Sequence, residues 1–326
     1  SASHATQPPQ RRNQRRHPQR PVTGVRLMPA AVLTSERRAT SSASSSQSQP
    51  QNRTEPQSIT VTIGEIPILL RPNDPTFCTT LENRYTGFTT ANESANTNAG
   101  ENTNPVCIFD IHLDPKGRPS DEDARVTRNG SLWNFRRGDF DATWDPRAGH
   151  GQVYQCPNPY SIDTILRITH SLVLAQQGGF LVHAASAVRN NRSFLFAGVS
   201  GAGKTTISRL APPDATLLTD EISYLRHTGS GYTAYGTPFA GELARVGANV
   251  SAPLAALYLL VQGPENRIRP VAPIDAARAL MRHILFFAEE KDLVARVFDS
   301  VLDFVSRVEV AQLVFTPDRR AWELIR

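Results

Sequence analysis

Lysine is scarce in this chain of 326 residues: Lys116, Lys204 and Lys291 are the only three, and arginine supplies the other 32 basic residues. A motif that demands lysine therefore arises by chance less often here than in an average protein. The chain also lacks any uninterrupted apolar run near the roughly 20 residues that a membrane-spanning helix needs. We therefore expect no transmembrane segment and no membrane partner.

Cysteine is equally sparse. Cys78, Cys107 and Cys156 are odd in number, widely spaced, and without a C-x-x-C pair or a neighbouring cluster of histidines. This pattern argues against both a disulfide framework and a zinc site. No apolar signal-peptide core follows the first arginines, so we expect a cytoplasmic protein.

The net charge of +5 is distributed unevenly. Residues 1–57 hold nine arginines against two glutamates, which gives that segment +7 and leaves the rest of the chain at −2. A nearly neutral body argues against a basic nucleic-acid groove, and we expect no nucleic-acid partner. The segment 1–57 is rich in Ser, Gln, Arg and Pro and poor in large apolar residues, which predicts a disordered tail. The alternative is a basic arm that docks on an acidic partner.

Residues 58–156 have the pattern of a small α+β domain. Alternating apolar residues predict a strand pair over 59–70, and a short helix is expected after Pro75. An Asn-, Thr- and Ala-rich loop follows over 91–105, and then a strand over 106–113. The segments around Trp133 and Trp144 are predicted to be further edge strands.

Residues 157–326 predict a second domain, a mixed sheet with helices. Its first helix should begin with Ser161 as N-cap and stop at Gly178-Gly179. Strands over 180–188 and 193–198 follow, joined by an asparagine turn. Further predicted elements are a strand over 216–219, a hairpin through HTGSGY, strands LAALYLLV and VEVAQLVF, helices near Asp275 and Glu289, and a short helix around Trp322.

The motif G-x-x-x-x-G-K-[ST] follows the strand SFLFA directly and opens into the apolar-periodic segment TISRL. Strand, glycine loop and helix are the context in which this motif binds phosphates, through inward-pointing backbone N–H groups. A lysine at this place reaches the β- and γ-phosphates, and the hydroxyl after it is the usual magnesium ligand. The alternative is a glycine-rich turn that matches by accident. The motif residues are Gly198, Val199, Ser200, Gly201, Ala202, Gly203, Lys204 and Thr205.

Two carboxylates, Asp220 and Glu221, end the strand that follows the loop. They are placed to hold magnesium and to accept a proton from an attacking hydroxyl. A solvated strand end is the alternative. The chain has no N-K-x-D segment and neither H-R-D nor D-F-G, which argues against a switch GTPase and excludes a protein kinase of the common eukaryotic type.

In the order histidine, hairpin, GVSGAGKTT and LLTDE, the chain resembles the catalytic domain of the bacterial HPr kinase/phosphorylase family. That family shares its phosphate-loop core with phosphoenolpyruvate carboxykinases. The closest resemblance is to diverged HPr kinase-like proteins, including kinases that tailor lasso peptides. It covers residues 157–326 and is most specific over 180–221. The fold it implies is α/β: a P-loop kinase domain with a mixed sheet, here preceded by the small α+β domain and the tail.

The resemblance also implies roles for individual residues. The segment Gly198–Thr206 would bind ATP, with Lys204 on its phosphates and Thr205 on magnesium. His183 would match the family's active-site histidine, although a lone histidine in an apolar strand is more often a core residue. Asp220 and Glu221 match an Asp-Asp pair, and which of them is the base stays open. Weaker matches are Glu242 as a magnesium contact and Arg267 as a catalytic arginine, for which an exposed loop arginine is the alternative.

We therefore expect an ATP- and Mg²⁺-dependent kinase that transfers a phosphoryl group to a hydroxyl, with serine of a protein or peptide as the acceptor. A kinase of a small molecule, such as free serine or a sugar, is the first alternative. A nucleotide-sensing scaffold without turnover is the second. The resembled family forms homo-oligomers, so a homo-oligomer is possible here. Whether the chain also catalyses the family's reverse, phosphorolytic reaction stays open, because the segments around Glu242 and Arg267 diverge from the family pattern. The segment 236–249 either covers the site or is a structural turn.

Overall fold

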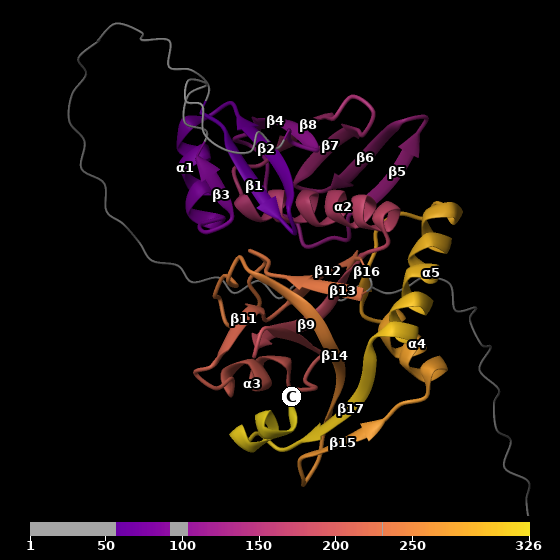
Figure 1. The fold of residues 1–326 in the computed structure, drawn as a ribbon. Coiled ribbons are helices and arrows are strands. Elements are labelled where there is room, and N and C mark those ends of the chain that lie inside the picture. Colours follow the sequence, from indigo (N-terminus) through magenta and orange to yellow (C-terminus); the bar gives the residue numbers. More distant parts are fainter. Residues whose placement is uncertain (1–56, 92–103, 230) are drawn as a thin grey trace, which may run out of the picture.

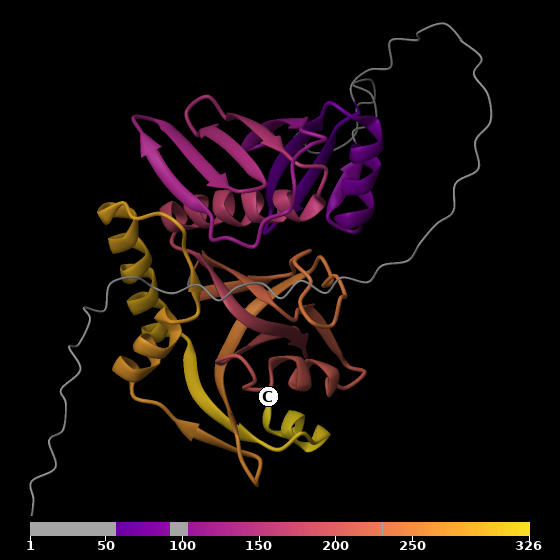
Figure 2. The same cartoon turned by 180° about the vertical axis from the view of Figure 1, so that it is seen from behind.

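A computed structural model describes residues 57–91, 104–229 and 231–326, which form an α/β structure with two mixed sheets (Figure 1). The predicted tail, except Gln57, and most of the predicted loop 91–105 lie outside the described residues. Seen from the front and from behind, helix α2 (Pro159–Gln177) lies between the two sheets (Figures 1 and 2).

The first sheet has eight strands in the order β3-β1-β2-β4-β8-β7-β6-β5. The predicted strand pair is confirmed as β1 and β2, and the predicted helix as α1, whose first turn is capped by Asp74. The segments around Trp133 and Trp144 were predicted as edges, which is wrong: β6 and β7 are interior strands because β5 pairs beyond them, and both rings are buried. The bounds are β1 Ile59–Ile63, β2 Ile66–Pro72, α1 Pro75–Arg84, β3 Thr89–Ala91, β4 Cys107–Leu113, β5 Arg125–Asn129, β6 Leu132–Arg137, β7 Phe140–Asp145 and β8 His150–Gln155.

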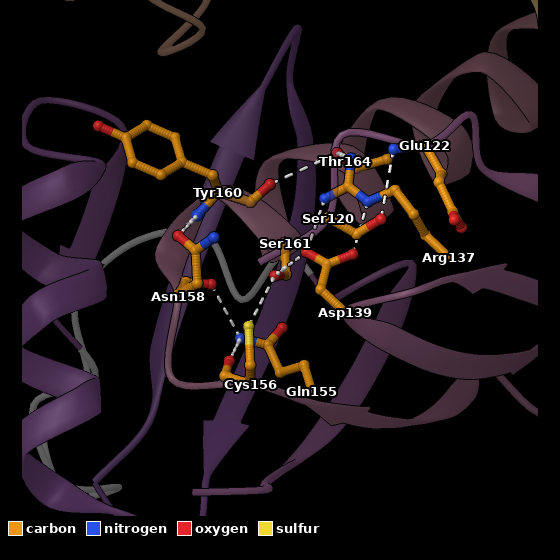
Figure 3. A network of polar contacts seen from close by, with 10 residues as sticks. All are labelled: Ser120, Glu122, Arg137, Asp139, Gln155, Cys156, Asn158, Tyr160, Ser161 and Thr164. Atoms are coloured by element: carbon orange, nitrogen blue, oxygen red, sulfur yellow. Dashed lines mark hydrogen bonds and ion pairs between the residues drawn. The ribbon is translucent and has the colours of Figure 1, made fainter. Parts of the chain in front are cut away.

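Helix α2 begins three residues earlier than its sequence predicts. Its N-cap is Asn158, whose side chain accepts a backbone N–H at 3.1 Å, and not Ser161. Ser161 lies inside the helix and donates its hydroxyl to Asp139 at 2.7 Å. Asp139 also accepts two hydrogen bonds from Arg137, whose third N–H bonds Thr164 (Figure 3). This network ties the turn between β6 and β7 to the first turns of α2.

The second sheet has nine strands, with the path β10-β9-β12-β13-β14-β17-β15 and with β11 and β16 paired to β9. Strand β14 runs parallel to β10 and β17 and antiparallel to β13. The predicted asparagine turn joins β9 to β10, with φ of 52° at Asn190 and 58° at Asn191. The bounds are β9 Phe180–Arg189, β10 Arg192–Ala197, α3 Lys204–Arg209, β11 Ala215–Thr219, β12 Ile222–Thr228, β13 Gly231–Tyr235, β14 Ser251–Gln262, β15 Arg267–Pro270, α4 Pro273–Met281, β16 Ile284–Leu285, α5 Lys291–Arg307, β17 Glu309–Phe315 and the 3₁₀ helix η1 Arg319–Leu324.

The hydrophobic core runs from one sheet to the other through α2. Thirteen of the 19 residues of this helix are buried, so it is covered on more than one face. The helix ends as predicted at Gly178, which adopts a left-handed φ of 77°. A second, smaller apolar cluster fills the space under η1 and the ends of β10, β14 and β17. Among the described residues, no helix combines the length and apolarity needed to cross a bilayer.

Candidate functional site

The glycine loop 198–203 leaves the end of β10 and enters α3. Gly201 and Gly203 have φ of 79° and 111°, a region that side chains with a Cβ rarely adopt. A Cβ on Gly203 would lie 2.6 Å from the Phe315 ring, and a Cβ on Gly198 2.6 Å from the Ala202 Cβ. Glycine therefore avoids a steric clash at positions 198 and 203 and backbone strain at positions 201 and 203.

Two hydrogen bonds hold the loop in this shape. Gln262, the last residue of β14, donates its side-chain amide to the Gly201 carbonyl at 2.7 Å. The Lys204 ammonium donates to the Gly198 carbonyl at 3.0 Å. Beside the loop lies a hollow lined by Gly203, Thr206, Gln262, Gly263, Phe315 and Pro317.

The segment 236–250 crosses over to the glycine loop. Its backbone is anchored to β11, where Thr237 and Ala248 donate N–H groups to Leu218 and Leu217. Between these two anchors, the Glu242 carboxylate accepts a hydrogen bond of 2.8 Å from the Thr205 hydroxyl. The predicted magnesium contacts Thr205 and Glu242, 37 positions apart, are thus brought into direct contact.

Asp220 holds this crossing segment in place. Its two carboxylate oxygens accept the backbone N–H groups of Gly241 and Leu243 at 2.9 and 2.8 Å, and the side chain is buried. These bonds position Glu242, which lies between the two donors in sequence. Asp220 therefore has a clear structural role in shaping the loop.

Glu221, the next residue, contacts His183. Strand β12 begins beside β9 with Ile222 opposite His183, and the Glu221 carboxylate lies 3.4 Å from the His183 Nε2. Burial would raise the pKa of Glu221, but the hydrogen bond and charge of His183, with the charges of Arg167 and Lys204, outweigh it and hold that pKa below its usual value. The carboxylate is therefore ionised at neutral pH.

Lys204 lies within range of the charges of both Glu221 and Glu242. Burial lowers the pKa of its ammonium, while the nearby charges of Glu221 and Glu242 act in the opposite direction. The five predicted residues Lys204, Thr205, Glu242, Glu221 and His183 thus form one constellation around the glycine loop.

Arg267 does not join this constellation. It lies exposed on β15, opposite Val314 of β17, and its side chain makes no hydrogen bond or ion pair with any described residue. Val199 and Ser200 are exposed at the tip of the glycine loop. The structure accounts for Arg267 as a residue of the sheet edge.

Two basic residues that the motifs do not indicate reach the same region. The carbonyl of His283 accepts the His183 N–H at 2.7 Å, and burial, with the charges of His183 and Lys204, lowers the pKa of the His283 imidazole to about 4. Arg167, on α2, interacts electrostatically with Asp163 and with Glu221. The only hint in the sequence is that Arg167 interrupts the apolar run of a buried helix, and nothing local marks His283.

The oxygen donors near the glycine loop suit a hard cation whose remaining coordination positions are filled by a bound ligand. Within residues 57–91, 104–229 and 231–326, no three His, Cys, Asp or Glu side chains gather into a metal-binding group. The Thr205 hydroxyl and the Glu242 carboxylate supply two oxygens. Magnesium typically takes one or two protein carboxylates together with substrate phosphates and water, so this donor set suits it.

Comparison with models of known protein families gives a match to part of the chain. The family model described as SynChlorMet cassette protein ScmC matches residues 161–325, from the first turn of α2 to the end of η1, just over half of the chain. No curated protein matches. The matched range contains the glycine loop, His183 and the carboxylates Asp220, Glu221 and Glu242. The chain therefore belongs to the SynChlorMet cassette protein ScmC family.

Proposed function

We propose that this chain is an ATP- and magnesium-dependent kinase, related to the HPr kinase-like proteins, that phosphorylates a hydroxyl of a serine-bearing protein or peptide. One observation carries the proposal: Lys204 of the glycine loop is near a hydroxyl–carboxylate pair, Thr205 and Glu242, and near a histidine–carboxylate pair, His183 and Glu221. The first pair suits a cation on phosphate, and the second suits proton removal. Phosphoryl transfer to an alcohol needs both.

The glycine loop supplies the phosphate site in this proposal. Its backbone N–H groups and the Lys204 ammonium would neutralise the nucleotide phosphates, and the hollow beside Phe315 leaves room for the rest of the nucleotide. Thr205 and Glu242 are the residues that would hold magnesium. Magnesium, when bound, neutralises phosphate charge and orients the phosphates.

Glu221 is the base in this proposal. Its carboxylate is ionised at neutral pH and oriented by His183, whereas both Asp220 oxygens are engaged by backbone N–H groups. The acceptor oxygen forms a bond to the γ-phosphorus, the bond from that phosphorus to the ADP oxygen breaks, and Glu221 takes the acceptor's proton. Positioning and charge neutralisation supply most of the rate in such reactions.

The test is transfer of labelled γ-phosphate from ATP, with magnesium, to a panel of acceptors: an HPr-like protein, serine-bearing peptides, free serine, a sugar and water alone. We expect transfer to a serine-bearing protein or peptide, and loss of transfer in Lys204→Ala. Transfer to free serine or to the sugar, but not to a protein or peptide, would instead indicate a small-molecule kinase. Tight ATP binding without any transfer would contradict the proposal and leave a nucleotide-sensing scaffold.

A second comparison tests the assignment of the base. Glu221→Gln removes the proton acceptor, and general bases contribute about 10²–10⁴-fold to a rate. Asp220→Asn keeps one carbonyl oxygen for a loop N–H, so its loss should be smaller. A larger loss in Asp220→Asn than in Glu221→Gln, at equal ATP affinity, would reassign the base to Asp220.

A further inference from the structure

Arg167 places a cation from α2 beside the site on the second sheet. Its guanidinium carbon lies 4.8 Å from the centroid of the Phe239 ring, which is buried at the start of the segment that carries Glu242. Its charge also acts on Glu221. A helix that packs on the first sheet thereby contributes to the Glu221 end of the site.

This guanidinium has no hydrogen-bond partner in the described part of the chain, and its Nε is buried without one. The nearest carboxylate on its own helix is Asp163, which is already engaged by the Arg84 guanidinium and, at 2.8 Å, by the Tyr85 hydroxyl. Arg84 and Arg137, the other largely buried arginines, each have a carboxylate. Arg167 as a whole is only partly buried, but its Nε–H is shut off from water without an acceptor, and such a donor is costly unless a ligand pairs with the guanidinium.

The position of Arg167 relative to Glu221 indicates which part of a substrate it meets. Arg167 stacks on the Phe239 ring, and the Phe239 carbonyl accepts a hydrogen bond of 3.4 Å from the Thr219 hydroxyl, which in turn accepts the Glu221 N–H at 3.1 Å. These contacts place Arg167 beside the backbone of Glu221. In the proposed reaction this is the side of the acceptor hydroxyl.

We infer that Arg167 is a substrate-binding residue that takes an oxyanion at the Glu221 end of the site. The planar guanidinium presents paired N–H donors that match a phosphoryl group or a carboxylate. Two sources have this chemistry: the phosphoryl group being transferred, and a carboxylate of the acceptor. The assignment of these sources rests on the proposed function, but the presence of an oxyanion site does not.

The first experiment reads the site without nucleotide or turnover. Orthophosphate is titrated by calorimetry into the full chain carrying Lys204→Ala, which weakens the glycine-loop site. Adding Arg167→Gln should weaken the remaining orthophosphate binding about tenfold or more, as expected for a lost charge-assisted contact. Adding Arg137→Gln, which breaks a buried ion pair far from the site in sequence, should leave the affinity within twofold.

Arg167→Lys keeps the charge but not the paired donors. It replaces Arg167→Gln in this experiment if thermal melting shows that Arg167→Gln does not fold. It should give a smaller but measurable loss of orthophosphate affinity. Equal affinities in the Arg167 variants and the Arg137→Gln control would overturn the inference. Because no kinase activity is measured, this outcome is independent of whether the proposed function holds.

Turnover then separates the two sources. If the oxyanion is the transferred phosphoryl group, Arg167→Gln lowers kcat and leaves the KM of the acceptor unchanged. If the oxyanion is a carboxylate of the acceptor, Arg167→Gln raises the KM of the acceptor and retains kcat. With an acceptor that lacks this carboxylate, Arg167→Gln and the unmodified chain then have the same KM. With an active acceptor, a kcat and a KM both within twofold of the unmodified chain would contradict a role in substrate binding.

Discussion

Replacing Gly203 with alanine tests the shape of the glycine loop most directly. The residue has φ of 111°, and the added Cβ would lie 2.6 Å from the Phe315 ring, which is 3% exposed and cannot easily move. A left-handed conformation costs a residue with a Cβ about 1–2 kcal/mol. Overpacking against a buried ring adds about 1–3 kcal/mol. Opening the loop relieves this strain, so the energy is lost from phosphate binding.

The matched control is Gly201→Ala. Gly201 also has a positive φ, 79°, but a Cβ there would have nothing within 4 Å. It should cost only the conformational part, about 1–2 kcal/mol. Measured by calorimetry with ATP and magnesium, Gly203→Ala should lose at least about 30-fold in affinity and clearly more than the control.

Phe315→Leu provides the second arm of this test. In the Gly203→Ala background it removes the ring that the new methyl group contacts, so it should recover part of the lost ATP affinity. Urea unfolding of every variant checks that the fold is retained. Equal affinities in Gly203→Ala and Gly201→Ala, or no recovery with Phe315→Leu, would refute the reasoning that packing against β17 shapes the loop.

Three further predictions follow from single contacts. Asp139→Ala leaves Arg137 buried without its partner, so urea unfolding should show a free energy of unfolding lower by about 3–5 kcal/mol. An unchanged midpoint of urea unfolding would show that the network of Figure 3 contributes little. Burial lowers the pKa of His170 to about 3, so the unfolded chain takes up the proton first and the free energy of unfolding falls as the pH drops below 6.5. His170→Gln should remove roughly 3 kcal/mol of this loss between pH 6.5 and 4, whereas an unchanged dependence of the free energy of unfolding on pH would contradict the reasoning. Glu242→Gln should weaken ATP binding in the presence of magnesium about tenfold and leave binding in EDTA unchanged, while equal losses in both conditions would remove Glu242 from the cation site.

Local features were predicted well because their causes lie within a few residues. The glycine turn that ends α2, the asparagine turn between β9 and β10, and the strand–loop–helix context of the motif all depend on backbone conformations that short sequences specify. The start of α2 was misplaced because two capping residues compete. Asn158 caps the helix, while the Ser161 hydroxyl is drawn to Asp139, 22 positions away.

Tertiary structure distinguished residues that look alike in sequence. Asp220 and Glu221 are adjacent carboxylates in the turn between β11 and β12, yet the first binds backbone N–H groups of the crossing segment and the second contacts His183 of β9. Arg267 was also expected in the site, and from its place on β15, opposite Val314 of β17, it makes no hydrogen bond or ion pair with the other predicted site residues that the structure describes.

The sequence by itself determined the α/β class, most elements of both sheets, and the phosphate-loop motif with its lysine and hydroxyl, because alternation, glycine and capping residues act locally. Only the tertiary structure decided that Thr205 meets Glu242, that Glu221 meets His183, and that Arg167 and His283 reach the same site. These contacts join residues 37 to about 100 positions apart, across crossing strands and a helix shared by the two sheets. Sheet pairing and packing choose such partners, and no short stretch of sequence encodes them.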